Sequence, residues 1–330
     1  AQFIAPAGGE VLDRTAVIAV GGNALIQDGQ RGTIAEQFGN AQATARHVAA
    51  LVKHGWRVVL THGNGPQVGF ILLRSELVSE DAPVPRLTLD MAVADSVGGV
   101  GYIMTNSLVN ELGKVGLADR VVCVMTQTVV DPADPAFQHP TKPVGRFLPH
   151  EEAAPMIAYG QTWEDRGEKG WRRVVASPEP VEVVDLEAVR ALMQAGYVVV
   201  TAGGGGIPVV VGPDGDYHGV EAVIDKDLTA ALLAAALDAD LLVIATDVDH
   251  VVAGFGTPEA ANVEHVTATE MRALAAAGHF PSGSMGPKVE AAVRFVETGR
   301  GRSCITSLSR LAAAVEDGFG TVIEPSDAQA

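Results

Sequence analysis

The sequence predicts an α/β protein, a three-layer αβα sandwich with a mostly parallel central sheet and an inserted lid subdomain. Short runs rich in valine and isoleucine alternate with amphipathic or alanine-rich stretches along the chain. The strand-like runs are apolar throughout, which is typical of parallel strands covered by helices on both faces. Glycine-rich loops directly follow several of these runs, at the strand ends where such sheets bind ligands.

The individual elements are predicted from local composition and from residues that favour helix starts. Apolar, β-branched composition predicts strands at residues 16–20, 57–61, 121–130, 197–201, 241–246 and 304–306. Amphipathic or alanine-rich stretches predict helices at residues 36–54, 66–79, 90–112, 226–237 and 284–298. Pro66 suits the first turn of its helix, where a missing N–H costs nothing. Asp225 suits an N-cap, because its carboxylate can accept from the free N–H groups of a first turn.

Composition limits the classes of function. Of the 330 residues, 47% are hydrophobic and 19% are charged, so the chain can build a large core. The formal charge is -17, which argues against a general nucleic-acid or acidic-membrane surface. Any anionic ligand must therefore be held by a few local cations and by backbone N–H groups.

The expected location is cytoplasmic. No run reaches the 18 or so apolar residues of a membrane span, and the first residues lack the basic and apolar regions of a signal peptide. Cys123 and Cys304 lie in apolar runs and are expected to be buried, unpaired residues, as in a reducing compartment.

Two lobes are expected, at residues 1–200 and 201–330. Residues 131–180 interrupt the strand–helix rhythm, because they are rich in proline and charge and hold two of the three tryptophans. A structureless loop of this length is rare in a compact domain, so an inserted lid is predicted. The alternative is a long surface loop.

Four glycine-rich loops point to phosphate binding. They span residues 21–24, 62–69, 203–208 and 282–288. Glycines allow backbone N–H groups to approach an anion at a helix N-terminus, although one such loop alone is usually only a turn. The spacings match neither a dinucleotide fingerprint nor a P-loop. His62, in the second loop, is expected to orient that loop rather than to act as a base.

The scarcity of lysine singles out three of them. The chain has six lysines among 23 basic residues, which leaves 17 arginines. A lysine kept in a special loop indicates a need for a compact, mobile charge, and Lys142, Lys226 and Lys288 occupy such loops. Asp227 could hold two lysines while they neutralise a transferring phosphoryl group. The alternatives are solvated lysines and an ordinary first-turn acid. No metal-binding motif is present.

Seven blocks carry a family resemblance. They are residues 19–24, 61–69, 140–143, 170–175, 203–208, 219–227 and 283–292. In this order they resemble the motifs of the carbamate kinases, in the amino acid kinase superfamily. The resemblance implies an amino acid kinase-like fold and reversible phosphoryl transfer between ATP and carbamate, giving ADP and carbamoyl phosphate. It also implies ATP/ADP and Mg²⁺ as cofactors, small-molecule substrates and a homodimer.

The resemblance also implies roles for individual residues. The catalytic set is Lys142, Lys226, Asp227 and Lys288. The substrate-binding set in the first lobe is Gly21, Gly22, Asn23, Gly63, Asn64 and Gly65. The nucleotide-binding set is Gly204, Gly205, Thr246, Asp247, Val248, His250, Phe255, Met285 and Gly286. Most amino acid kinases have a lysine just before the first glycine pair, but Ala19 and Val20 stand here, so Lys142 would supply that charge from the lid.

The chain departs from the family pattern at a few positions. Asp95 and Val97 replace other residues on the helix after the second glycine loop, and His250 and Phe255 stand where tyrosine-type residues are common. Two alternatives therefore stay open. One is a related kinase acting on another small carboxylate or carbamate-like acid, and the other is a non-catalytic nucleotide-binding regulator on the same fold.

Overall fold

The computed structural model describes residues 14–27, 29–77, 85–280 and 285–326. An eight-stranded sheet runs through the molecule in the order β15-β17-β16-β12-β1-β2-β9-β3. Its strands are β1 (Thr15–Val20), β2 (Arg57–His62), β3 (Val121–Cys123), β9 (Val198–Val200), β12 (Leu241–Thr246), β15 (His265–Thr267), β16 (Arg302–Ser307) and β17 (Thr321–Glu324). All neighbours are parallel except β16 and β17, so most strands end at one edge.

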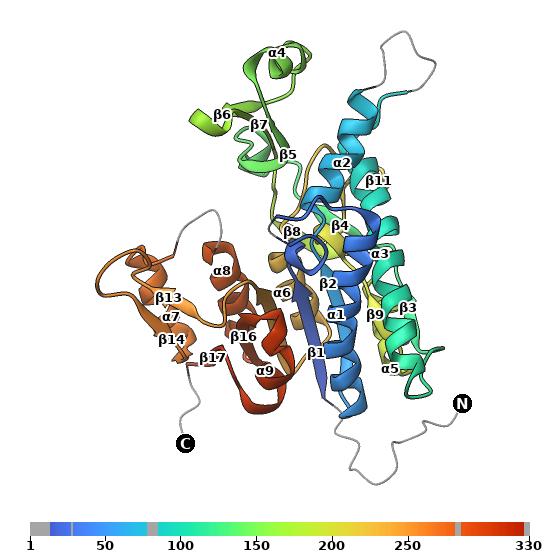
Figure 1. The fold of residues 1–330 in the computed structure, drawn as a ribbon, viewed down its shortest axis with the longest axis vertical. Coiled ribbons are helices and arrows are strands. Elements are labelled where there is room, and N and C mark those ends of the chain that lie inside the picture. Colours follow the sequence, from blue (N-terminus) through green and yellow to red (C-terminus); the bar gives the residue numbers. More distant parts are fainter. Residues whose placement is uncertain (1–13, 28, 78–84, 281–284, 327–330) are drawn as a thin grey trace.

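Helices cover both faces of this sheet, which confirms the predicted three-layer α/β fold (Figure 1). Alternate residues of β1 take part in two separate cores, with Ile18 in one and Val17 in the other. The first core is completed by α1 (Ile34–Lys53), α3 (Leu89–Gly113) and α9 (Leu311–Asp317). The second is completed by α5 (Leu186–Gln194), α6 (Lys226–Ala236), α7 (Ala268–Ala276) and α8 (Met285–Glu297).

Helix starts follow the chemistry of their first residues. Thr33 and Glu36 form a capping box at α1, and Thr267 and Glu270 form another at α7. Asp225 caps α6 by accepting from the Asp227 N–H at 2.9 Å. In contrast, α2 (Gly65–Glu76) begins without a side-chain cap, so its first N–H groups are left for other partners.

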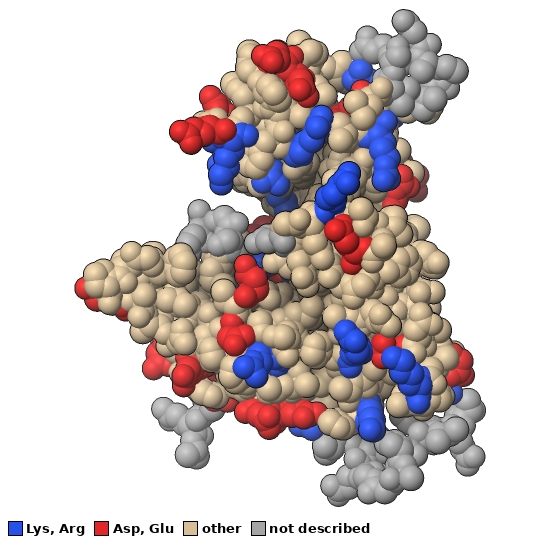
Figure 2. Space-filling view, viewed as in Figure 1, with Lys and Arg blue, Asp and Glu red and all other residues tan. Residues whose placement is uncertain are grey.

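Residues of the predicted insertion form structure of their own. Strands β5 (Lys142–Leu148), β6 (Trp163–Asp165) and β7 (Trp171–Val175) make a three-stranded sheet, joined by α4 (His150–Ala158). This unit, called the lid subdomain below, stands apart from the main body at the top of Figure 1. Figure 2 shows a hollow beneath it, with basic side chains gathered along its upper rim.

A second sheet joins strands from both sides of the expected lobe boundary at residue 200. β4 (Gln127–Val130), β8 (Pro180–Val183), β10 (Ile207–Val211) and β11 (Tyr217–Gly219) pair in the order β11-β10-β4-β8. Residues 207–219 therefore pack with the first lobe, although a boundary at residue 200 would place them in the second. A small hairpin of β13 (Val251–Ala253) and β14 (Ala261–Val263) lies in the second lobe.

Some expected elements are corrected by the structure. Residues 121–130 are not one strand, because the chain leaves β3, turns at residues 124–126 and enters β4 in another sheet. The helices α5 and α7 and the strand β17 were not expected. Cys304 is buried as predicted, whereas Cys123 is only half-buried. No helix in the described ranges is long and apolar enough to cross a membrane.

The lid subdomain meets the main body by close backbone packing. A Cβ atom on Gly69 of α2 would lie 2.6 Å from the Cα of Gly145 in β5. Gly145 itself has a φ of 67°, which glycine adopts without strain. Arg173 of β7 adds an ion pair, 3.4 Å from Glu76 at the end of α2. The lid subdomain and α2 are therefore packed as one unit.

Gly69→Ala should lower the free energy of unfolding by about 1–3 kcal/mol, the cost of overpacking a close contact. Gly39→Ala is the matched control, because Gly39 lies in α1 with open space around its would-be Cβ. That control should raise stability by up to about 1 kcal/mol through helix propensity. Urea denaturation of both variants measures the difference. Equal effects would show that α2 and β5 are not tightly packed.

Candidate functional site

A cavity of about 770 Å³ opens at the carboxyl ends of β1 and β12. This is the edge where the predicted loops follow the parallel strands. The expected site residues that line it are Gly21, Gly22, Asn23, Asp227, Thr246, Asp247, Val248, His250, Phe255, Met285 and Lys288. They come from the first glycine loop, from the first turns of α6 and α8, and from the end of β12 and the segment that follows it.

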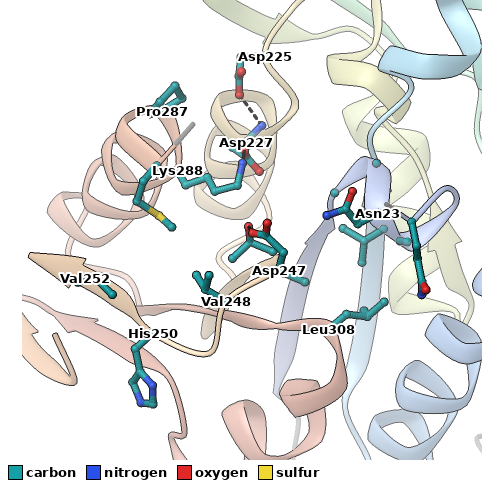
Figure 3. Close-up of a pocket in the computed structure, with 18 of the residues that line it drawn as sticks. Asn23, Asp225, Asp227, Asp247, Val248, His250, Val252, Pro287, Lys288 and Leu308 are labelled. Atoms are coloured by element: carbon teal, nitrogen blue, oxygen red, sulfur yellow. Dashed lines mark hydrogen bonds and ion pairs between the residues drawn. The ribbon is translucent and has the colours of Figure 1, made fainter. Parts of the chain in front are cut away.

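One end of the cavity is built around a buried carboxylate. Asp227 is 3% exposed and lies in the first turn of α6. The Lys226 ammonium pairs with one of its oxygens, and the Lys288 ammonium, from the first turn of α8, lies 3.2 Å from the other. Figure 3 shows Lys288 extending from α8 toward Asp227. The structure thus brings together three of the four predicted catalytic residues.

The fourth catalytic candidate reaches the same place from the lid subdomain. The Lys142 ammonium donates to the carbonyl of Ile224 at 3.1 Å and to the carboxylate of Asp225 at 3.2 Å. Asp225 also receives the Asp227 N–H as the cap of α6 (Figure 3). Three lysines therefore meet two aspartates, which leaves a local excess of positive charge beside the cavity.

The electrostatics of Asp225 reflect this excess. Burial by itself would raise the pKa of its carboxyl group. The ammonium groups of Lys142 and Lys226, with the backbone hydrogen bond from Asp227, outweigh burial and lower that pKa to about 2. Asp225 is therefore ionised at neutral pH and serves as a fixed counter-charge. It was expected only as a helix cap, and the lysines packed on it give it a wider role.

The other end of the cavity is apolar. Val248, Val252 and Leu308 line it together with His250 (Figure 3). A cavity that is charged at one end and apolar at the other suits a ligand with phosphates and a flat base. Sequence reasoning missed Leu308 and Gln27, which also line the cavity. For Leu308 a signal existed, because it directly follows β16 at the same edge of the sheet.

The second glycine loop lies beside the first. The Gly63 N–H donates to the carbonyl of Val20 at 2.9 Å, and a Cβ on Gly63 would lie 3.1 Å from the Gly22 nitrogen. Asn64 is buried, whereas Gly65 is exposed at the start of α2. These three residues do not line the cavity itself. Of the three, Gly63 packs directly against the first glycine loop.

His62 is buried at the end of β2, and its role as a loop-orienting residue fits its surroundings. Its Nδ1 donates to the Gly63 carbonyl at 3.0 Å, since a carbonyl can only accept. Burial lowers the pKa of His62 to about 4, and the nearby Lys226 ammonium acts in the same direction. The ring is therefore neutral near pH 7, and its lowered pKa makes it a weak proton acceptor.

The third glycine loop differs from its expected role. Gly204 and Gly205 were expected to contact the nucleotide, but they are buried and do not line the cavity. A Cβ on Gly203 would lie 2.3 Å from the His62 ring, and one on Gly204 would lie 1.9 Å from the Asn64 amide nitrogen. The third glycine loop instead packs against His62 and Asn64 of the second glycine loop.

The remaining expected positions are placed as follows. Gly286 lies in the first turn of α8 but does not line the cavity. Residues 282–284 of the fourth loop lie outside the described residues. Val97 is 1% exposed and packs in an apolar cluster with Val68 and Val93, whereas Asp95 is exposed. Neither of these two side chains lines the cavity.

Comparisons with known proteins show the family of the chain. The amino acid kinase family model matches residues 14–307. A carbamate kinase of Pyrococcus furiosus is 45% identical over 317 residues, covering 95% of this chain and 100% of that protein. The carbamate kinase-like protein YahI of Escherichia coli is 44% identical over 310 residues, covering 93% of this chain and 98% of that protein.

Solved structures give the same result. The structure of carbamate kinase from Giardia lamblia bound to AMP-PNP has a TM-score of 0.89 and 38% identity, covering 96% of this chain and 100% of that chain. The chain belongs to the amino acid kinase family. Within that family it groups with the carbamate kinases, which confirms the resemblance seen in its motifs.

The pKa of His62 predicts a specific pH dependence of stability. In the folded state His62 stays neutral down to about pH 4, whereas in the unfolded chain it takes up a proton below about pH 6.5. The unfolded state therefore binds more protons between these values, and stability falls as the pH is lowered through them. This one group should account for about 3 kcal/mol of the loss.

His62→Gln keeps an N–H donor for the Gly63 carbonyl and removes the titration. Urea unfolding at several pH values between 7.5 and 4.5 compares the variant with the wild type. The gap between the two curves at pH 7.5 serves as the reference. As the pH falls, the free energy of unfolding should decrease more for the wild type than for the variant. Equal decreases for the two proteins would contradict the assignment.

Proposed function

We propose that this protein is an ATP-dependent carbamate kinase, which transfers a phosphoryl group reversibly between ATP and carbamate. The products are ADP and carbamoyl phosphate. The observation that carries the proposal is the buried Asp227 carboxylate with an ammonium group on each oxygen, at the charged end of the cavity. The similarity to carbamate kinases over 95% of the chain supports the same activity.

The geometry explains how the residues would act. A carbamate oxygen attacks the γ-phosphorus of ATP, and the bond from that phosphorus to the β–γ bridging oxygen breaks to release ADP. Such a reaction needs mainly positioning and charge stabilisation. Lys226 and Lys288 would neutralise the phosphoryl group and the departing phosphates. Asp227 holds both ammonium groups in place, so they need not reorganise during the transfer.

The acyl substrate would bind at the adjoining glycine loops. Gly22 and Gly63 pack against each other there, and α2 begins without a side-chain cap. The N–H groups of Gly21–Asn23 and of the α2 N-terminus would bind the anionic carbamate and the phosphoryl oxygens. The nucleotide would occupy the apolar end near Val248 and Leu308. This arrangement places the two substrates on either side of the lysine pair.

The residues also fit a role for Mg²⁺ that arrives with the nucleotide. In the described parts of the chain there is no group of three or more metal-ligating side chains. Asp227 is occupied by two lysines, whereas Asp247 faces the cavity and is exposed. Mg²⁺ commonly keeps water ligands and binds through phosphates and one carboxylate, and it would neutralise phosphate charge here. Asp247 is the carboxylate that would support it.

We also propose that residues 131–180 act as a lid. Lys142 reaches from the lid subdomain to the α6 cap, so a movement of that subdomain would bring or remove a positive charge. The tight Gly69–Gly145 contact implies that α2 moves with it. Because α2 begins at the substrate loop, closure would order the acyl site and exclude water together.

A homodimer and a cytoplasmic location complete the proposal. The outer face of α3 carries exposed Met91 and Tyr102 beside exposed Gly98 and Gly99, with Asp95 as its charge. A smooth, weakly charged helix face of this kind suits a second copy of the chain. The two free cysteines support a reducing compartment.

The direct test is formation of ATP from ADP and carbamoyl phosphate by the purified protein. Acetyl phosphate and other small acyl phosphates are compared in the same assay. Preference for carbamoyl phosphate supports the proposal, and preference for another acyl phosphate favours a related kinase. Nucleotide binding without turnover of any acyl phosphate would favour a non-catalytic regulator.

Lys226→Ala and Lys288→Ala should each reduce turnover by roughly 10²–10³, as expected for loss of one preorganised charge in the transition state. Folding should survive, because neither side chain fills the apolar core. Lys53→Ala is the control, since Lys53 is exposed at the end of α1. Steady-state assays with a thermal unfolding check provide the measurement. Near-normal turnover in either site variant would refute the assigned role.

Lys142→Ala should lower turnover and leave ADP affinity near normal, because the apolar end of the cavity holds the nucleotide. Single-turnover rates and ADP calorimetry separate the two effects. If the variant loses ADP affinity and turnover in equal proportion, Lys142 is a nucleotide-site lysine and the lid hypothesis is wrong.

A further inference from the structure

A serine of α3 lies in contact with the second glycine loop. Ser96 is 1% exposed, and its hydroxyl oxygen accepts from the side-chain nitrogen of Asn64 at 2.8 Å. The same hydroxyl donates to the carbonyl of Val93 at 2.6 Å. Asn64 is the N-cap residue of α2, but its side chain does not cap the helix. Its amide is therefore held by α3 and not by its own helix.

The count of protons in this pair fixes the orientation of the amide. A serine hydroxyl has one proton, and the Val93 carbonyl can only accept it. Toward Asn64 the hydroxyl can therefore only accept, so the amide nitrogen must face Ser96. The amide oxygen, Oδ1, is then turned away from Ser96. With the amide reversed, two oxygens without a proton between them would face each other.

The third glycine loop restrains the amide from another side. A Cβ on Gly204 would lie 1.9 Å from the Asn64 nitrogen and 2.2 Å from Cγ, so the glycine backbone lies directly against the amide. Before it, buried Ala202 adopts an uncommon left-handed conformation, with φ at 48°. Its carbonyl accepts from the Thr61 hydroxyl at 2.9 Å, and its N–H donates to the Thr126 hydroxyl at 3.1 Å. These bonds hold the loop in place.

We infer that Ser96 is a positioning residue that orients the Asn64 amide toward the acyl substrate. This inference rests on the proposed function, because it gives Asn64 a place in the acyl site. Carbamate differs from a simple carboxylate such as acetate by an amino group that can donate. Because Ser96 holds the Asn64 nitrogen, Oδ1 is left as the atom that would accept from that amino group. Ser96 would thus help to select carbamoyl phosphate over acyl phosphates that lack the donor.

The test is Ser96→Ala, with Ser107→Ala as a matched control. Ser107 lies on the same helix, is 3% exposed, and also donates its hydroxyl to a helix carbonyl, that of Ile103. Ser96→Ala should lower kcat/KM for carbamoyl phosphate by about tenfold, the scale of one good hydrogen bond. Acetyl phosphate, measured as substrate or competitive inhibitor, and the KM for ADP should change by less than about twofold. Ser107→Ala should change neither selectivity nor rate.

A double-mutant cycle with Asn64→Ala separates positioning from a general structural effect. If Ser96 acts through Asn64, Ser96→Ala should have little further effect in the Asn64→Ala background. Additive losses, or equal losses for carbamoyl and acetyl phosphate, would overturn the inference. Should Ser96→Ala not fold stably, Ser96→Cys keeps the volume and weakens the acceptor, and it is judged by the same two criteria.

One readout does not depend on the proposed activity. The Asn64 side-chain amide gives its own NMR signals, which are identified by their loss in Asn64→Ala. Ser96→Ala should shift these signals and Ser107→Ala should not, and signals unmoved by Ser96→Ala would overturn the inference. If the wild type makes no ATP from carbamoyl phosphate while these signals respond as expected, the proposed function fails and the positioning contact stands.

Discussion

The ion triplet formed by Lys226, Asp227 and Lys288 is the interaction on which the site depends. A buried carboxylate is costly unless it is paired. Here the two ammonium groups come from the first turns of two different helices, α6 and α8, and a third lysine reaches the α6 cap from the lid subdomain. The requirement for pairing therefore holds three separate parts of the chain at one point.

The glycine loops serve this site in two different ways. The first opens directly into the cavity, where small residues let backbone N–H groups approach a ligand. The third is buried and leaves room for other side chains, with Gly203 against His62 and Gly204 against Asn64. Both need glycine, but one needs it for a ligand and the other for packing. The sequence pattern alone does not distinguish these two reasons.

Several features could be predicted because they depend on local chemistry. Apolar runs followed by glycine-rich loops predicted β1, β2 and β9, and the scarcity of lysine singled out Lys142, Lys226 and Lys288. The helix α5 was missed because it is short, at nine residues, and its strong amphipathic pattern follows a proline-rich stretch. The run 121–130 was read as one strand because both halves are apolar, although a turn at Thr126 sends them to different sheets.

The sequence by itself determined the fold class, the order of the strands along the chain, the glycine loops and the residues that carry charge. It did so because hydrophobic periodicity, backbone freedom and side-chain chemistry are properties of neighbouring residues. Only the tertiary structure decided that Asp227 is shared by two lysines, that Gly204 supports Asn64 and that Val97 is buried. The Lys288–Asp227 and Gly204–Asn64 contacts join residues far apart along the chain, and Val97 lies in a cluster that includes residues of other elements. Their geometry depends on how the sheet aligns its strand ends.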